Sequence, residues 1–236
     1  MTLYSRFCGS ASQLSITLVA LLFAWGGSAV HAQDRDPTFP DRPSMDKKTT
    51  PTQEVIDALD LSNSQVASVD FRGSDPRGDT TFTDVASNFP QEGESYLALS
   101  SGCAGAALDP NDEEDFSCVL DNGPDGPGNA TDIVRMELEL NVPSDASTIQ
   151  FDLKYLSEEF PEFVGSSFND AFVVEMGQST FTVDSNNNLI APDNLVFDGN
   201  GNPITINTTG ATGMTSGGAV GTTYDGGTQV LTTTIQ

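Results

Sequence analysis

The sequence predicts an all-β protein, an antiparallel β-sandwich of the jelly-roll kind with one short N-terminal helix. Apolar residues recur at every second position in several separate runs, as in strands that bury one face. Clusters of Gly, Asn, Asp and Pro separate these runs, as turns do. Only one short run has helical spacing. The region from 50 to 236 is long enough for one such domain with its own core.

Residues 1–32 are predicted to be a secretory signal peptide. Arg6 supplies a positive n-region, 14–25 is an apolar stretch, and Val30-His31-Ala32 supplies a small-residue cleavage site. The apolar stretch is shorter than the roughly 20 residues that span a bilayer, and no later run approaches that length. We therefore expect an exported protein, secreted or held at the cell surface, that begins near Gln33 and has no transmembrane segment.

Residues 33–49 are predicted to be a disordered linker, and residues 50–236 the β domain. The linker is rich in Pro, Asp and Lys and shows no periodicity. Thr50 is a helix-capping residue, followed by proline at the first helical position and Gln53 at the third. Apolar residues then follow at helical spacing: Val55, Ile56 and Leu59. This pattern predicts one helix over residues 51–60.

Three runs carry the clearest strand pattern. Their expected inward-facing residues are Ala67, Val69 and Phe71; Val134, Met136, Leu138, Leu140 and Val142; and Ile149, Phe151, Leu153 and Tyr155. Shorter candidate strands lie at 96–99, 171–176, 180–183, 204–207 and 230–235. The Gly/Thr-rich run 208–227 is expected to be either a long surface loop or a weakly specified hairpin.

Charge and composition exclude several classes of function. The chain carries 34 acidic and 9 basic residues, a formal net charge of −25 at pH 7, so nucleic acid is not an expected partner. The single histidine and the single tryptophan lie within the predicted signal peptide. Without histidine, the exported chain lacks the base of Ser-His-Asp and Cys-His systems and a usual zinc ligand. The acidic excess indicates solubility in a salty medium or binding of divalent cations.

Cys103 and Cys118 are the cysteines outside the predicted signal peptide. In an oxidising compartment two such thiols most simply form one disulfide, which would contribute about 3 kcal/mol by the chain-entropy model. The alternative is a pair of free buried thiols. The disulfide would close a strongly acidic loop.

The strongest candidate site is the segment 156–172, which follows the 149–155 strand. Carboxylates and amides stand there among aromatic residues, at the end of one strand and the start of the next. Calcium takes about six to eight oxygen ligands from such groups. The pattern predicts a calcium site formed by Glu158, Glu159, Glu162, Asn169 and Asp170. The alternative is a structural role, in which these groups cap turns while the phenylalanines fill the core.

Two other loops are rich in oxygen-bearing side chains. Residues 184–188 resemble a calcium loop but lack the Gly and Glu positions of an EF-hand, so we expect a hairpin turn. Residues 121–128 are likewise expected to be a turn. A secreted carbohydrate hydrolase is the enzymatic alternative, with Glu158 paired with Glu162 or Asp170. The scarcity of aromatic residues that stack on sugars disfavours that alternative.

The run Ser157-Glu158-Glu159-Phe160-Pro161-Glu162-Phe163, followed by Phe168-Asn169-Asp170-Ala171-Phe172, resembles the signature of the choice-of-anchor L family of bacterial secreted and surface proteins. The close resemblance covers about residues 130–176, and a weaker one runs through 69–73 and 89–102. It implies an exported, non-catalytic, β-rich module that attaches to the cell surface or to an extracellular matrix component. A purely structural domain of an envelope protein is a further alternative.

Two departures from the family pattern affect these expectations. Phe160 stands where the family often has tyrosine, which removes a hydroxyl. Family members usually continue after a strand like 230–235, so a chain that ends at Gln236 is expected to be an incomplete domain.

Overall fold

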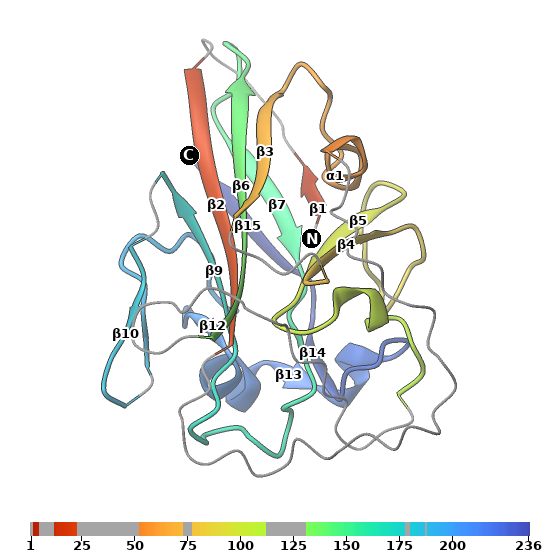
Figure 1. Ribbon diagram of the computed structural model, residues 1–236, viewed down its shortest axis with the longest axis vertical. Coiled ribbons are helices and arrows are strands. Elements are labelled where there is room, and N and C mark those ends of the chain that lie inside the picture. Colours follow the sequence, from red (N-terminus) through yellow and green to blue (C-terminus); the bar gives the residue numbers. More distant parts are fainter. Residues whose placement is uncertain are drawn as a thin grey trace.

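A computed structural model shows a protein built mainly of antiparallel strands (Figure 1). It describes residues 2–4, 12–22, 52–72, 77–111, 131–177, 180–186 and 188–236. The strands are β1 Thr2–Tyr4, β2 Ser12–Leu22, β3 Val66–Arg72, β4 Asp79–Phe82, β5 Tyr96–Leu99, β6 Thr131–Val142, β7 Ile149–Leu153, β8 Leu156–Ser157, β9 Ala171–Met176, β10 Thr182–Val183, β11 Leu189–Ile190, β12 Ile204–Thr205, β13 Met214–Thr215, β14 Gly226–Thr228 and β15 Leu231–Ile235. The helical segments are α1 Thr52–Ala58, the short 3-10 helices η1 Ala104–Ala106 and η4 Ser216–Ala219, and the π-helix η3 Ile206–Gly210.

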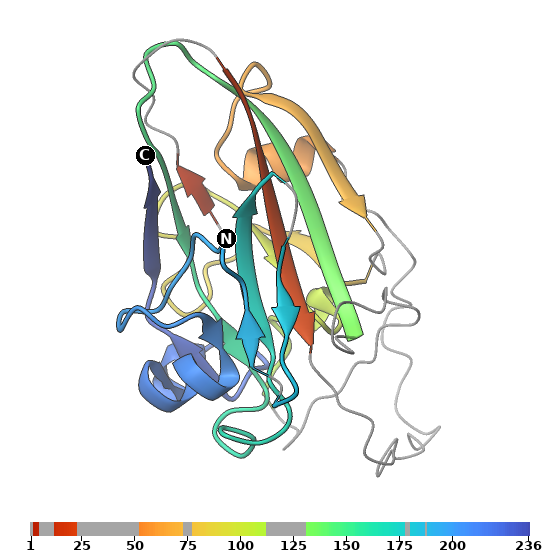
Figure 2. The same ribbon diagram turned by 90° about the vertical axis from the view of Figure 1, so that its left-hand side faces the viewer.

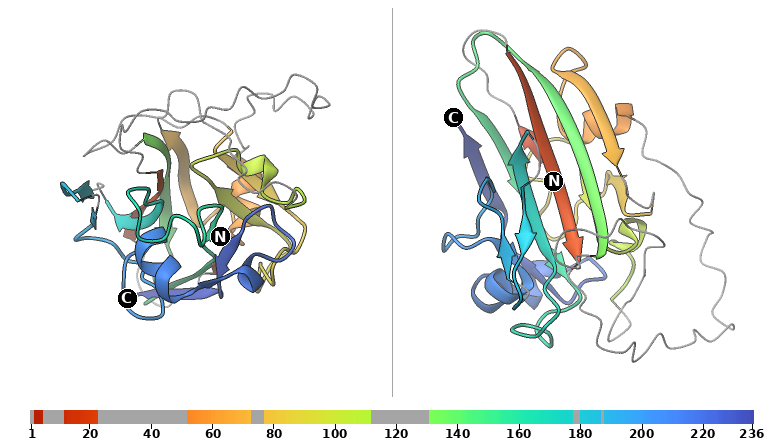
Figure 3. Two further views of the ribbon diagram at one scale, coloured as in Figure 1. Left: turned by 90° about the horizontal axis from the view of Figure 1, so that it is seen from below. Right: turned by 60° about the vertical axis from the view of Figure 1, so that its left-hand side comes forward.

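The largest sheet has five strands in the order β12-β9-β2-β6-β3. A second sheet has the order β1-β7-β15, and a third β13-β14-β8, while β4 with β5 and β10 with β11 form two-stranded pairs. The long strands β2, β6 and β9 run side by side in both Figure 2 and Figure 3. The all-β, antiparallel prediction is therefore confirmed.

The main core contains residues from two of these sheets. Strand β6 contributes Met136, Leu138 and Leu140, none more than 1% exposed, and β7 contributes Phe151, which is fully buried. Val55 and Ile56 of helix α1, and Leu59 just after its end, belong to the same cluster. The period-two and helical patterns thus identified the buried faces correctly, because burial of one face imposes that periodicity on the sequence.

Most predicted strands are found within a residue or two of their expected bounds, and β3 shows one instructive difference. Ala67 was expected to face inward but is exposed, while Val66, Val69 and Phe71 pack against the core. The register between β3 and β6 shifts between Val66 and Ser68. Such a bulge inserts one residue without a partner and reverses the alternation on one side of it.

Strands β1 and β2 lie within the segment predicted to be a signal peptide. Strand β2 covers most of the apolar stretch and pairs along one edge with β6 and along the other with β9. Cleavage near residue 32 stays a prediction, but it would remove the middle strand of the largest sheet.

The Gly/Thr-rich run 208–227 is packed structure in which β13 pairs antiparallel with β14, in line with the hairpin alternative. It holds the end of η3, then β13, η4 and the start of β14. Thr209, Thr222 and Thr223 in this run are buried. The Oγ1 atom of Thr215 accepts a hydrogen bond from the Gly218 N–H at 3.1 Å, so threonine serves here as a helix cap.

Three sequence predictions fall wholly or partly on residues outside the described ranges: the 33–49 linker, the 121–128 turn and the pairing of Cys118. Cys103 itself is buried, 4% exposed, and takes part in a disulfide. Its pairing with Cys118 stays a prediction. Among the described residues, no helix is long and apolar enough to cross a membrane.

Candidate functional site

The candidate site forms where the chain leaves β7 and enters β9. After β7 the chain passes through the short strand β8, whose partner is β14. Ser157, the last residue of β8, is buried, and its Oγ accepts a hydrogen bond from the Glu159 N–H at 3.0 Å. Asp170 immediately precedes β9. Two strand ends therefore fix Glu158, Glu159 and Asp170 close to one another.

Close packing against two glycines holds this segment in place. A Cβ atom on Gly226 would overlap the ring of Phe160, the residue after Glu159. A Cβ atom on Gly227 would lie 2.6 Å from Cδ2 of Leu156. Only glycine permits this approach of the β14 backbone, so the Gly226-Gly227 pair is part of what positions the carboxylates.

Glu159 has the most unusual environment in the cluster. The Asp170 N–H donates a hydrogen bond to its carboxylate, but its Oε2 atom is buried and accepts no hydrogen bond from any described residue. Burial raises the pKa of Glu159 to about 7, and the Asp170 hydrogen bond opposes that rise only in part. A buried carboxylate that lacks a full set of donors holds a proton, or a cation, more tightly than one in water.

The groups around Glu159 are also acidic or phenolic. Both carboxylate oxygens of Glu158 and the Oδ1 atom of Asp170 are buried. Ser101 Oγ donates to Asp170 Oδ2 at 3.4 Å, and the Tyr155 hydroxyl donates to the Asp170 carbonyl oxygen at 2.9 Å. Several buried carboxylate oxygen atoms thus lie in one cluster.

Two tyrosines border this cluster and report its negative charge. Burial raises the pKa of Tyr155, and the charges of Asp170 and Glu159 raise it further. Burial likewise raises the pKa of Tyr224, and the charges of Glu158 and Asp170 add to that effect. Each phenol feels two of the three carboxylates, which places all three within one electrostatic neighbourhood.

The structure separates the five predicted ligands into two groups. Glu158, Glu159 and Asp170 come together. Asn169 lies beside them in sequence, but its Oδ1 atom accepts the Asn207 N–H at 3.1 Å, which is the structural role that was the alternative reading. Glu162 is exposed in the turn that follows. In the described part of the chain, no three Asp, Glu, His or Cys side chains already converge in metal-binding geometry, so a cation would have to draw the three carboxylates closer.

Sequence reasoning missed the residues that surround these carboxylates. Tyr155 was recognised only as an inward-facing strand residue, and Ser101 and Tyr224 belong to segments far away in the chain. No local spacing links them to residues 158–170. Tyr155 alone gave a signal, because a buried tyrosine hydroxyl needs a hydrogen-bond partner.

The 184–188 loop is a hairpin turn between β10 and β11, as predicted. Asp184 Oδ1 accepts the N–H groups of Asn186 at 2.7 Å and Asn188 at 3.0 Å. Asp198 repeats this arrangement with Asn200 at 2.8 Å and Asn202 at 2.9 Å. Both carboxylates are satisfied by the chain itself, so neither loop requires a cation.

A polar pocket of about 510 Å³ has a different set of lining residues. Its lining is Ser87, Asn88, Gln91, Lys154, Gln229 and Val230. Lys154 Nζ donates to the Ser87 carbonyl oxygen at 2.6 Å, and burial lowers the pKa of Lys154. This lining contains no carboxylate, so it does not supply the acid and base that the hydrolase alternative requires.

Comparison with family models, with curated proteins and with solved structures found no match to this chain.

Proposed function

We propose that the protein is an exported, non-catalytic β-sandwich module that serves attachment to a cell surface or an extracellular matrix component. We further propose that calcium stabilises it at the buried cluster of Glu158, Glu159 and Asp170. The resemblance to the choice-of-anchor L signature supports the first part. The acidic composition and the buried carboxylates support the second.

The observation that carries the cation proposal is the buried Oε2 atom of Glu159. It has no hydrogen-bond donor among the described residues, and it lies next to the Asp170 backbone in a cluster of further acidic groups. A charged group in such a place is unfavourable unless a proton or a cation compensates it. Calcium would supply the missing positive charge and accepts carboxylate, hydroxyl and carbonyl oxygens as ligands.

Thermal unfolding of the purified protein at pH 8, with excess calcium and then with a chelator, tests this proposal. Calcium at a hundred times its dissociation constant adds about 2.7 kcal/mol, which corresponds to roughly 5–10 °C for a chain of this size. The calcium effect should shrink at pH 5, because protons then occupy Glu159.

Exposed Glu162 provides the matched control for this experiment. Glu162→Gln should retain the full calcium effect, whereas Glu159→Gln should lose it. An unchanged melting temperature in calcium at both pH values would refute the cation site, and equal loss of the effect in both variants would point to surface binding instead.

The raised pKa of Glu159 also favours the hydrolase alternative, since a general acid needs a pKa near neutrality. However, the Glu158 carboxylate oxygens and Oε2 of Glu159 are shielded from solvent, and a general acid must reach its substrate. Glu158→Gln separates the two functions. If Glu158 were catalytic, this variant would lose turnover and keep its stability, whereas loss of a calcium ligand at that position would lower the stability and the calcium effect together.

A further inference from the structure

We propose that the space between β6 and β9 is a strand-acceptance site once the predicted signal peptide has been removed. Its occupant is an extended, uncharged, mainly apolar strand donated by another polypeptide. This inference rests on the export that is part of the proposed function, and on cleavage near residue 32. It does not depend on calcium.

The geometry of β2 defines this site. Strand β2 pairs with β6 at ten register positions, from Ser12 opposite Val142 to Leu22 opposite Thr131. It pairs with β9 at six positions, from Ile16 opposite Met176 to Leu21 opposite Ala171. Both pairings are antiparallel, and β2 lies between β6 and β9 in Figure 1 and again in Figure 3. Its removal therefore opens two facing strand edges within one sheet.

Each of these edges is costly to leave open. Strand β6 would keep only β3 as a partner, and β9 only β12 and the segment around Asn194. Unpaired N–H and C=O groups at an edge are a template for another strand. The side chains beneath them, Met136, Leu138 and Val174, are at most 1% exposed and would become open to water. A strand that entered the empty site would therefore pair its backbone with two edges and cover apolar side chains.

The site cannot close by a small movement. Strands β6 and β9 each pair with β2, which lies between them. Their axes are therefore two strand spacings apart, about 9.5 Å. Strand β9 is also fixed from its other side. The Leu195 N–H donates to the Val174 carbonyl oxygen at 2.8 Å, and the Val174 N–H donates to Asn194 Oδ1 at 3.1 Å. Closure would break these buried contacts, whereas an added strand keeps them.

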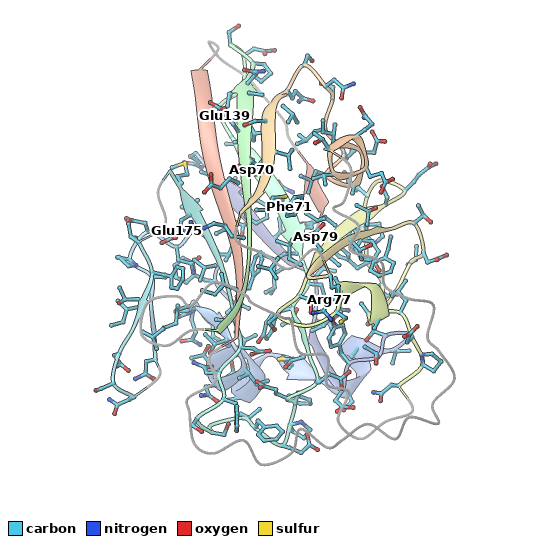
Figure 4. All side chains as sticks on the ribbon, in the orientation of Figure 1. Asp70, Phe71, Arg77, Asp79, Glu139 and Glu175 are labelled. Carbon is cyan, nitrogen blue, oxygen red and sulfur yellow. The ribbon has the colours of Figure 1, made fainter. Side chains whose placement is uncertain are left out.

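The surroundings define the chemistry of the occupant. Glu139 of β6 and Glu175 of β9 lie on opposite sides of β2 in Figure 4, and Glu137 stands two residues before Glu139. Glu137 pairs with Arg135 at 3.9 Å and Glu175 accepts hydrogen bonds from the Thr180 N–H, so an added strand needs no charge of its own to compensate them. The segment that fills the site, Ser12–Leu22, contains no charged residue. Ten register positions require a strand of about 33 Å.

Donation of a strand into an open sheet is a known mode of protein recognition, in which backbone hydrogen bonds supply affinity and alternating side chains supply specificity. For an exported module it would provide attachment to a partner without a covalent anchor. The partner is thus recognised as a donor of an uncharged β-strand.

The test uses the full chain with a specific protease site placed in residues 33–49. The folded protein is cleaved at that site, and a labelled peptide of residues 11–23 with two terminal lysines is added in excess. We expect the peptide to displace the native segment and to bind with one copy per chain. A peptide carrying Leu18→Pro should not bind, because proline lacks the N–H that a central strand must donate.

Two results would overturn the proposal. In the first, the native segment leaves after cleavage and the remaining chain keeps its cooperative melt but takes up no peptide, which would mean that β6 and β9 had closed. In the second, mass spectrometry of the exported protein shows that residues 1–32 are retained, so the site is never vacated. Uptake of both peptides alike would count against strand pairing too. Calcium is absent throughout, so failure of the cation site does not affect the outcome.

Discussion

Two groups of carboxylates in this protein are accommodated in opposite ways. Asp198 is 6% exposed, yet two backbone N–H groups and side chains of Asn202 and Thr212 donate to it. Burial alone would raise its pKa, but these donors together lower the pKa below its ordinary value. Glu159 is also largely buried but has one such donor, and its pKa rises to about 7. In an acidic chain, the pKa of a buried carboxylate thus depends on how many donors it receives.

The two environments respond to pH with opposite signs. Asp198 has a lowered pKa, so its contribution to stability is present above the ordinary value of 3.8 and is lost as the pH falls. Glu159 has a raised pKa, so its contribution is full below 4.5 and is lost as the pH rises toward 7. Without a bound cation, the folded state is therefore favoured most between these two transitions.

The largest expected effect comes from Gly226→Ala. The new methyl group overlaps the Phe160 ring and must push the Glu158-Glu159 segment away from β14. Overpacking of this kind costs about 3 kcal/mol, measured by urea unfolding. The calcium effect should fall in the same variant. Gly199→Ala is the control, because nothing lies within 4 Å of that Cβ position. Equal costs at both glycines would show that the contact with Phe160 is unimportant.

Glu159→Gln should give the next largest effect, and only above the pH at which Glu159 ionises. The amide removes the buried negative charge, so without calcium the free energy of unfolding at pH 8 should rise by about 2–3 kcal/mol. Near pH 4.5 the variant and the parent should be equally stable, since the parent side chain is then largely protonated. Unfolding curves from pH 4 to pH 8 measure this difference. A constant difference across that range would contradict the ionisation assigned to Glu159.

Asp198→Ala should destabilise the protein at neutral pH. It removes a buried side chain that accepts the Asn200 and Asn202 N–H groups at the base of an exposed turn. Loss of a charged acceptor of two backbone donors costs about 2 kcal/mol. Calcium should still raise the melting temperature of this variant. Loss of the calcium effect in this variant would indicate that calcium binds at the Asp198 loop and not at Glu159.

Asp184→Ala should have the smallest effect. Its hydrogen bonds match those of Asp198, but the side chain is only half-buried, so water can replace the carboxylate as the acceptor for the released N–H groups. The melting temperature should change far less than in Asp198→Ala. If Asp184→Ala and Asp198→Ala lowered the melting temperature equally, burial of the carboxylate would not account for the difference between the two turns.

The sequence predicted the strands better than it predicted the buried cluster. Strands β5 and β9 match their expected bounds, because local alternation reflects a buried face. Strands β13 and β14 could be expected only as a weakly specified hairpin without bounds, because the close backbone packing of the glycines in β14 leaves no periodic signal. Leu14, Ile16 and Leu18 alternate with Gln13, Ser15 and Thr17, a strand pattern inside the predicted signal peptide that was read only as apolar.

In the buried cluster, Glu158, Glu159 and Asp170 were predictable because they stand at two strand ends. Their separation from Glu162 was not, since the turn after Phe160 carries Glu162 to the surface. Nor was the presence of Ser101 and Tyr224, which tertiary contacts bring from segments more than 50 residues away. A single sequence records such contacts only in the buried polar residues that need them.

The tyrosines beside the buried cluster have a practical consequence. The single tryptophan of the chain lies in the predicted signal peptide, so the ultraviolet emission of the exported protein would come from Tyr96, Tyr155 and Tyr224. Two of these three phenols feel the charge of Asp170 directly. A cation bound beside Asp170 would neutralise that charge and change the fluorescence of these two tyrosines. Cation binding could therefore be followed by intrinsic tyrosine fluorescence, without an added dye.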